Sequence, residues 1–339
     1  MFKVDIHTHI LPKTIPNFKS DFGYGGFITI EPTRSGCAKL LYDDGRFFRT
    51  VNDNCWDPSV RLQECERNNE DVQVLSTVPV MFNYWAKPKD TLTVAQYLND
   101  HIAKIVDQYP RNFVGLGTVP LQEPELAIKE LHRCVKELGL AGVEIGTHVN
   151  EWNLDEPSLF PFFQEAEKLG AAIFVHPWDM VGKKEMPKYW LPWLVGMPTE
   201  TARAICSMIF SGILEKLPKL RIAFAHGGGV FAYLLGRIRH GFNMRPDLCA
   251  VDNEHDPVRY LGKFYVDSLV HDSRSLDYLI EVLGEDCIAL GSDYPFPLGE
   301  NQPGKLVGSM AHLAPVTKEK LLGGTALKWL DLSKEIFIR

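Results

Sequence analysis

The 339 residues are 45% hydrophobic and 23% charged, with a formal net charge of −7 at pH 7, as is ordinary for a globular protein. The negative balance disfavours a nucleic-acid partner, because binding a phosphate backbone needs a basic surface. No stretch free of Asp, Glu, Lys and Arg reaches the roughly 18 residues that a membrane helix needs, so we also expect no membrane partner.

The seven cysteines are odd in number, scattered and never spaced as CxxC. This pattern disfavours a disulfide framework and a zinc–thiolate cluster, so a metal would have to be held by His and carboxylate side chains. The chain runs directly into an apolar segment without a visible secretory signal. We therefore expect a cytoplasmic protein.

Eight short, apolar, β-branched runs recur along the chain and predict strands. Near-continuous hydrophobic strands are typical of a parallel sheet covered on both faces, and helical patterns lie between most of these runs. Eight strands alternating with helices predict a single α/β domain over 1–339, a (β/α)8 TIM barrel. A doubly wound open sheet is the alternative, but no GxGxxG turn follows the first strand. The predicted strands are 3–10, 72–79, 113–120, 142–149, 171–178, 221–228, 263–270 and 287–295.

The segment 12–54 interrupts this alternation. It is rich in Gly and aromatic residues and contains two or three alternating stretches. Such stretches predict a small antiparallel β insertion after the first strand. An insertion at this place would lie over the mouth of the barrel, so we expect it to form a lid or a substrate wall.

Polar side chains recur where the predicted strands end. His7 and His9 are one residue apart in the first strand, and alternate residues of a strand point to the same face. His176 ends the fifth strand, His226 the sixth and Asp293 the eighth. Each alone could be a surface, turn or cap residue. Because the C-terminal ends of all barrel strands meet at one mouth, we expect the five side chains to be neighbours.

Histidine nitrogens and carboxylate oxygens suit Zn²⁺, which in catalytic sites commonly takes three protein ligands and a water. We predict a five-coordinate variant with His7, His9, His176 and Asp293 as metal ligands. Zinc lowers the pKa of its bound water towards 7, so hydroxide becomes available near neutral pH. We assign the base that takes up the proton to His226, which precedes three glycines that let the backbone pass close to a ligand.

Several motifs together resemble a known family. "DIHTHILP", "FVHPWDM", "FAHGGG" and "LGSDYPFP" resemble the amidohydrolase superfamily of metal-dependent barrels. Longer stretches, among them "LSTVPVMFNYWAKP" and "HGFNMRPDLCA", are similar to the decarboxylases of 2-amino-3-carboxymuconate 6-semialdehyde over nearly the whole chain. The resemblance implies one Zn²⁺ per subunit and loss of CO2 to give 2-aminomuconate 6-semialdehyde, a step of the kynurenine pathway of tryptophan catabolism. The implied route adds zinc-bound hydroxide to a substrate double bond before the carbon–carbon bond breaks.

The resemblance also implies which residues bind the substrate. It matches Arg49 and Arg237 to two arginines that bind the substrate carboxylates, and the second of these reaches across from the neighbouring subunit of a homodimer. Trp193 would line the substrate pocket, and Phe47 belongs to the same specificity region. Without the resemblance, both arginines would be interpreted as solvated surface charges.

Two other functions stay open. Another decarboxylase, hydratase or hydrolase of the superfamily would use the same metal on a related unsaturated acid, since a fold alone does not fix the reaction. A non-catalytic barrel used for binding is the third interpretation, against which the intact set of histidines and Asp293 argues. His148 and His271 lie near strand ends, where a supporting role behind the ligands is also open.

Overall fold

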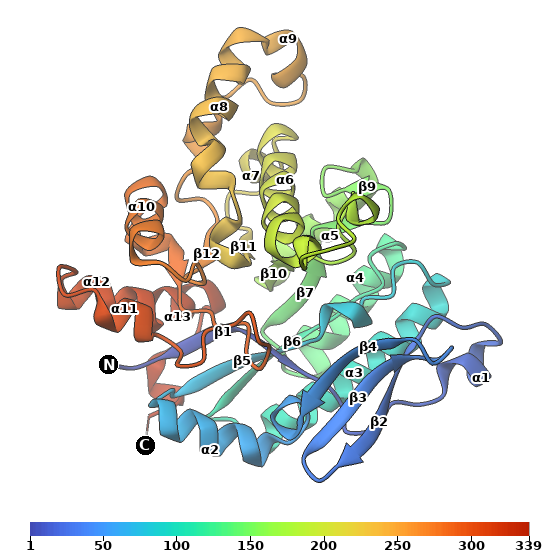
Figure 1. Ribbon diagram of the computed structural model, residues 1–339. Helices are drawn as coiled ribbons and strands as arrows, with labels where there is room; N and C mark the ends of the chain where they lie inside the picture. Colours follow the sequence, from blue (N-terminus) through green and yellow to red (C-terminus); the bar gives the residue numbers. More distant parts are fainter. Residues whose placement is uncertain (339) are drawn as a thin grey trace.

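In the computed structural model, which describes residues 1–338, eight parallel strands form one sheet (Figure 1). The edges of this sheet approach each other, since the backbone N–H of Ile6 donates to the carbonyl of Leu290 and that of His9 to the carbonyl of Tyr294, both at 2.8 Å. The sheet is therefore a nearly closed barrel, and the predicted TIM barrel is confirmed. In spatial order the strands are β1 (Val4–Ile10), β5 (Val72–Thr77), β6 (Phe113–Gly117), β7 (Gly142–Gly146), β10 (Ala172–His176), β11 (Arg221–Phe224), β12 (Tyr265–Asp267) and β13 (Ile288–Ala289).

Helices between the strands cover the outside of the barrel (Figure 1). Several begin with Pro in the first turn, where the missing N–H leaves no hydrogen bond unmade. In the helix after the insertion, for example, Pro58 follows Asp57, whose side chain accepts from the backbone N of Ser59. The longer helices are α2 (Pro58–Asn68), α3 (Pro88–Gln108), α4 (Pro124–His132), α5 (Phe160–Leu169), α6 (Met197–Phe210), α8 (Phe231–Met244), α10 (Ser273–Leu283) and α13 (Thr325–Leu330). The shorter ones are α1 (Phe18–Phe22), α7 (Ile213–Lys216), α9 (Pro246–Cys249), α11 (Lys305–Ser309) and α12 (Pro315–Glu319).

The interior of the barrel is apolar at the end where the strands begin. Val4, Val72 and Phe174 pack together there, and the ring of Trp329 from α13 lies 6.1 Å from that of Phe174. The indole N–H of Trp329 donates to the carbonyl of Arg221, the first residue of β11, at 3.2 Å. Because α13 closes this end, the polar chemistry of the barrel is left to the C-terminal ends of the strands.

The insertion contains the predicted antiparallel sheet. Its strands β2 (Ile28–Arg34), β3 (Cys37–Tyr42) and β4 (Phe47–Asn52) pair in sequence order inside the predicted segment 12–54. Leu40 and Val51 of this sheet pack in one apolar cluster with Val80 and with Leu98 of α3. The sheet is thereby fixed to one side of the barrel (Figure 1). A second, two-stranded sheet joins β8 (His148–Val149) to β9 (Trp152–Asn153).

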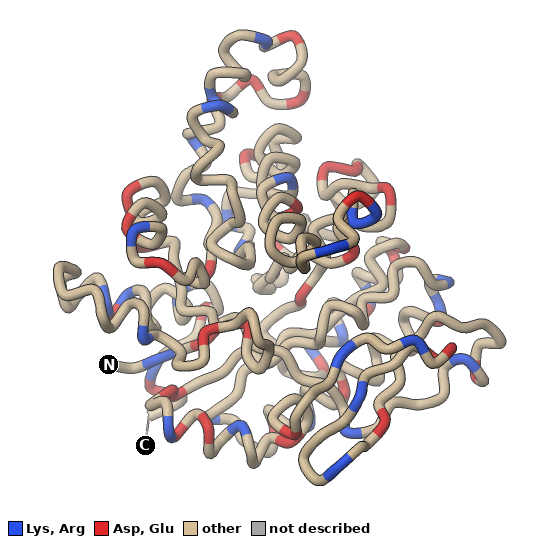
Figure 2. Tube along the Cα trace, viewed as in Figure 1, with Lys and Arg blue, Asp and Glu red and all other residues tan. Residues whose placement is uncertain are grey.

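Two features of the periphery bear on function. Helices α8 and α9 project from the body of the molecule (Figure 1). Basic and acidic residues are interspersed along the outer elements, with no large block of one sign (Figure 2). Among the described residues, no helix is both long and apolar enough to span a bilayer.

Candidate metal centre

Four side chains from distant parts of the chain converge at the C-terminal end of the barrel strands. His7 and His9 lie on β1, His176 is the last residue of β10, and Asp293 lies in the loop after β13. One possible ligand atom from each lies within 4.8 Å of the others, and all four residues are buried. The structure thus brings together the four residues that were predicted as metal ligands.

The neighbouring segments hold each imidazole in one orientation. The Nδ1 of His9 lies 2.9 Å from the carbonyl oxygen of Thr77, and that of His176 lies 2.9 Å from the carbonyl oxygen of Pro177. A carbonyl oxygen has no proton to donate, so in both contacts the histidine Nδ1–H must be the donor. The Nε2 atom of each neutral ring is therefore left with its lone pair.

These lone pairs face one another without a hydrogen-bonding partner. The Nε2 atoms of His7, His9 and His176 are buried, and none has a hydrogen bond within the described residues. The Oδ1 atom of Asp293 lies 3.5 Å from the Nε2 of His7 and 3.1 Å from that of His9. Lone pairs and a carboxylate that converge in this way repel each other unless a cation lies between them. The donor set therefore fits a divalent metal that accepts nitrogen and oxygen ligands.

Burial and mutual charge set the pKa values of this cluster. Burial lowers the pKa of His9, and it lowers the pKa of His176 well below the usual value. For His7, burial is outweighed by the hydrogen bond from Nδ1 to Asp267 and by the nearby negative charge of Asp293, which together raise its pKa to about 10. Contacts with His7 and His9 likewise overcome burial and hold the pKa of Asp293 well below its ordinary range. Without a metal, one proton on His7 would partly balance the Asp293 carboxylate, and a bound cation would displace it.

Asp267, at the end of β12, supports the cluster and was not singled out from the sequence. Its fully buried carboxylate accepts a hydrogen bond from Nδ1 of His7 at 2.7 Å and from the backbone N–H of His226 at 2.8 Å. It also accepts from the backbone N–H of Gly227 at 2.7 Å. A carboxylate behind a ligating imidazole fixes the ring and makes it a better donor to metal. The signal in the sequence was a single Asp within the apolar stretch "KFYVDSLV", without a spaced partner.

His226 lies beside the four predicted ligands rather than among them. Its ring centre is 5.2 Å from that of His7 and 5.1 Å from that of His176. Burial, followed by the positive charge of His7, lowers the pKa of His226 to about 4, so the ring is neutral at pH 7. His226 and Asp293 both have a φ of 57°, a left-handed conformation that non-Gly residues rarely adopt. Conformations of this kind are retained mainly where the surroundings enforce them, as at functional sites.

A pocket opens from the metal cluster towards the insertion. His9, His176 and Asp293 form its polar floor, and Arg49 of β4 contributes a guanidinium. That guanidinium lies 4.3 Å from the ring centre of Phe296 and has no ion pair within residues 1–338. Burial lowers the pKa of Arg49, because a desolvated cation without a paired anion is disfavoured. The pocket therefore presents an unpaired cation near the metal cluster, within reach of an anionic ligand. The remaining walls are mainly apolar and aromatic: Phe48, Val78, Pro79, Trp178, Trp190, Trp193, Met197, Phe296, Pro297 and Leu298.

The other two predicted substrate residues are placed differently. Phe47 is 60% exposed and does not line this pocket, whereas its neighbour Phe48 does. Arg237 lies on the projecting helix α8, is exposed and is not part of the pocket of its own chain. Sequence reasoning also did not single out Trp178, whose ring packs 5.7 Å from that of Phe48.

Glu144 of β7 is a further acidic group below the cluster. It is fully buried, its Oε1 lies 3.7 Å from Nδ1 of His9, and burial raises its pKa well above the ordinary value. The two other histidines near strand ends, His148 and His271, lie outside the cluster. His148 contacts the carbonyl oxygens of Asn150 and Asp179, and His271 lines a separate cavity near β12.

A set of three histidines and one aspartate at the mouth of a parallel barrel is the arrangement of a metal-dependent barrel protein. The sequence model of the amidohydrolase family matches residues 4–332, and the chain belongs to this family.

The chain is also similar to relatives with assigned reactions. It is 58% identical over 336 residues to the 2-amino-3-carboxymuconate-6-semialdehyde decarboxylase of Dictyostelium discoideum, covering 99% of this chain and 93% of the relative. It is 39% identical to the enzyme of that name from Caenorhabditis elegans, covering 98% and 95%. The crystal structure of a dihydroxybenzoic acid decarboxylase from Polaromonas, which contains manganese, superposes with a TM-score of 0.79 over 100% of this chain and 99% of that one. At 20% identity this last likeness establishes the fold alone.

Proposed function

We propose that this protein is a zinc-dependent decarboxylase that converts 2-amino-3-carboxymuconate 6-semialdehyde to 2-aminomuconate 6-semialdehyde and CO2. The observation that carries the proposal is the 58% identity over 99% of the chain to a decarboxylase of that substrate. The convergence of His7, His9, His176 and Asp293 in one buried cluster supports a metal-dependent mechanism.

In this proposal the four clustered residues hold one Zn²⁺. When bound, the ion supplies Lewis acidity and makes a coordinated water acidic near neutral pH. Asp267 orients His7, and the carbonyls of Thr77 and Pro177 orient His9 and His176, so the donor atoms are preorganised.

His226 is the proposed proton carrier. Its lowered pKa keeps the ring unprotonated at pH 7, which is the form that can accept a proton. Asp267 accepts a hydrogen bond from the backbone N–H of His226. This contact holds the ring beside the cluster, although His226 is not itself one of the proposed metal ligands. Accepting a proton and returning it to the substrate carbon would require no net acid or base from solvent.

Arg49 is the proposed anchor for one substrate carboxylate, because a guanidinium binds a carboxylate through two parallel hydrogen bonds and fixes its orientation. Trp193 and the other aromatic walls would keep water from the reacting atoms. The insertion at about 12–54 carries Arg49, which supports its role as a lid or substrate wall on a single domain. The specificity role of Phe47 stays a proposal, because its side chain faces solvent in this structure.

The second carboxylate would be bound by Arg237 from the neighbouring subunit of a homodimer. The support for this lies on the projecting arm formed by α8 and α9. Arg237 is exposed there, and so are several large apolar side chains that a second copy of the chain would cover: Tyr233, Met244, Leu248 and Val251. Exposed apolar side chains gathered in one region are typical of a protein interface. We further propose that the protein acts in the cytoplasm, in the kynurenine pathway.

Metal analysis and a product assay test the proposal. We expect about one Zn²⁺ per subunit, loss of activity after chelation, and recovery with Zn²⁺; Mn²⁺ should be compared because it accepts similar donors. Absorbance of freshly generated substrate should fall with release of CO2 and without net uptake of water. Uptake of water without CO2 would indicate a hydratase or hydrolase. Full activity after exhaustive chelation would overturn the metal-dependent mechanism.

A further inference from the structure

Asp293 lies outside the regular sheet, yet its position must be fixed. Strand β13 ends at Ala289, four residues earlier, and Asp293 itself adopts a left-handed backbone conformation. A loop residue in such a conformation reverts to a more favourable one unless its neighbours hold it. The neighbours that could hold it are the residues on either side, Ser292 and Tyr294.

Ser292 is fixed from β1. Its backbone N–H donates to Oδ1 of Asp5 at 3.0 Å, and its hydroxyl donates to Oδ2 of the same buried carboxylate. This contact holds the chain before Asp293 against the strand that carries His7 and His9.

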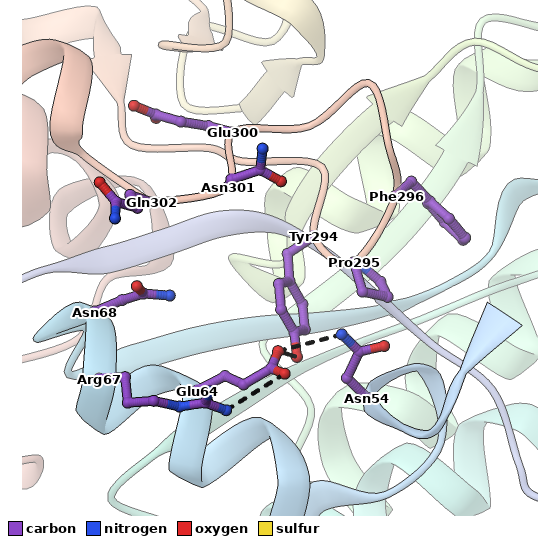
Figure 3. A pocket seen from close by; sticks show the side chains of 10 residues that line it. All are labelled: Asn54, Glu64, Arg67, Asn68, Tyr294, Pro295, Phe296, Glu300, Asn301 and Gln302. Atoms are coloured by element: carbon purple, nitrogen blue, oxygen red, sulfur yellow. Dashed lines mark hydrogen bonds and ion pairs between the residues drawn. The ribbon is translucent and has the colours of Figure 1, made fainter. Parts of the chain in front are cut away.

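Tyr294 is fixed from α2, on the outside of the barrel. Its ring packs against the guanidinium of Arg61, whose central carbon is 4.6 Å from the ring centre. Its hydroxyl donates to Oε2 of Glu64 at 2.5 Å (Figure 3). Glu64 lies one turn after Arg61 on the same helix. Tyr294 and Glu64 form part of the wall of a polar cavity of about 440 Å³ beside this contact. Its floor is separate from the metal cluster, because none of the four clustered residues lines it.

Arg61 also contacts the strand that carries the histidines. It is fully buried, and its Nη1 donates to the carbonyl of His9 at 2.7 Å while its Nη2 donates to the hydroxyl of Thr8 at 2.9 Å. Its Nε donates to the amide oxygen of Gln73 at 3.0 Å, and within residues 1–338 its hydrogen-bond acceptors are all neutral. A buried cation whose contacts are all neutral is expensive to keep, so a purely stabilising role is a poor explanation for it.

The same pair of residues reaches the end of the insertion. Nη1 of Arg61 donates to the carbonyl of Asn54 at 3.2 Å, and the Asn54 amide donates to Oε2 of Glu64 at 3.2 Å (Figure 3). Asn54 follows β4, which carries Arg49. One turn of α2 thus contacts the backbone of His9, the residue after Asp293 and the segment after the Arg49 strand.

We propose that Arg61 and Glu64 of α2, acting through Tyr294, are positioning residues that set the place of Asp293 relative to His9. The Tyr294–Glu64 hydrogen bond fixes the outer end of the tyrosine, Arg61 fixes its ring, and the peptide unit shared with Asp293 transmits that position to the carboxylate. This inference rests on the proposed function, in which Asp293 and His9 hold the metal.

Tyr294→Phe and Glu64→Gln test the inference in the full-length protein. Tyr294→Phe removes the Tyr294–Glu64 hydrogen bond, and Glu64→Gln weakens it together with the contacts of Glu64 to Asn54 and Arg67. Both variants leave every proposed ligand in place. We expect Zn²⁺ loss to an excess of chelator to be roughly tenfold faster in each variant. We also expect the visible absorption bands of the Co²⁺-loaded protein to shift, and kcat to fall more than KM rises. The effects of the two substitutions should be less than additive in the double variant, because both disturb the Tyr294–Glu64 hydrogen bond.

Glu66→Gln is the matched control, since it makes the same charge change at an exposed position of the same helix. It should lose Zn²⁺ at the wild-type rate. If Tyr294→Phe fails to fold, as judged by its thermal midpoint, Glu64→Gln alone decides the matter. Wild-type rates of Zn²⁺ loss with an unchanged Co²⁺ spectrum in a folded Glu64→Gln variant would overturn this inference alone. A wild-type protein that binds neither ion would overturn both the inference and the proposed function.

Discussion

The two halves of the candidate site are built in different ways. The metal half is made of histidines on or directly after barrel strands together with Asp293, and each of its imidazole contacts lies within one chain. The substrate half takes Arg49 from the insertion, Trp193 from the π-helical turn Pro192–Gly196 that leads into α6, and, in the proposed dimer, Arg237 from another subunit. The first half is complete in a single chain, whereas the second would be completed by a partner subunit in the proposed dimer.

This difference has a physical origin. Barrel strands are fixed by hydrogen bonds on both sides, so side chains at their ends are placed with little freedom. Loops and insertions are fixed by fewer contacts and tolerate change, which is why relatives on one barrel can act on different acids. We therefore expect substitutions in the metal half to abolish chemistry and those in the substrate half to change binding.

Asp293→Ala should have the largest effect. Removing the only carboxylate of the cluster takes away the anionic ligand, so the variant should lose both Zn²⁺ and activity. A metal ion contributes several kcal/mol to transition-state stabilisation, and kcat/KM should fall by roughly four orders of magnitude or more. Metal analysis and the absorbance assay check this, with Asp252→Ala at an exposed position as the control. Full activity would remove Asp293 from the site.

His226→Ala separates metal binding from proton transfer. The variant should keep its Zn²⁺, because His226 lies beside the ligand set, while kcat falls roughly a thousandfold through loss of the proton carrier. The measurements are metal content and turnover of the same preparation. Loss of the metal together with activity would show that His226 is a ligand and that the assignment of roles is wrong.

Arg49→Ala and Arg237→Ala test whether the substrate half is shared between subunits. Each variant alone should lose roughly a hundredfold in kcat/KM, because a bidentate contact to a carboxylate disappears. Random mixing of the two variants should restore about a quarter of wild-type activity, since half of the dimers would hold one intact site out of two. Mixed dimers that remain as inactive as the parents would contradict a shared site.

Phe48→Ala and Phe47→Ala form a matched pair with the smallest effects. Phe48 lines the pocket and packs against Trp178, so its loss should raise KM roughly tenfold. Phe47 is exposed, and its loss should change KM by less than about twofold. Titration of substrate against both variants measures this. A larger effect at Phe47 would indicate that the insertion rearranges when substrate or a second subunit binds.

The barrel and the metal cluster could be predicted from the sequence because both follow from simple periodicities. Apolar runs of strand length alternate with helical patterns, and alternation along β1 places His7 and His9 on one face. The topology of the barrel then brings His176 and Asp293 to the same mouth, although they are far apart along the chain.

The supporting contacts could not be predicted in this way. The side chains of Asp267 and Arg61 form hydrogen bonds to residues of another strand. Nothing in the sequence around Asp267 or Arg61 identifies those distant partners. Phe48 was missed because the pairing of β3 with β4 shifts between Leu40 and Leu41, opposite Arg49 and Phe47. Such an irregularity interrupts the alternation that would place Phe47 and Arg49 on one face. The proposed role of Arg237 rests on the family resemblance, because no sequence pattern within one chain indicates a contact with a second subunit.

In the proposed mechanism, Asp267 links two tasks that are otherwise carried by separate residues. Its carboxylate holds the ring of His7 and, at the same time, the main chain of His226 and Gly227. A proposed metal donor and a proposed proton acceptor that share one support should move together rather than independently. Changes at this one aspartate would consequently disturb both tasks together, so its substitution cannot apportion the rate acceleration between them, whereas substitutions at the two histidines can.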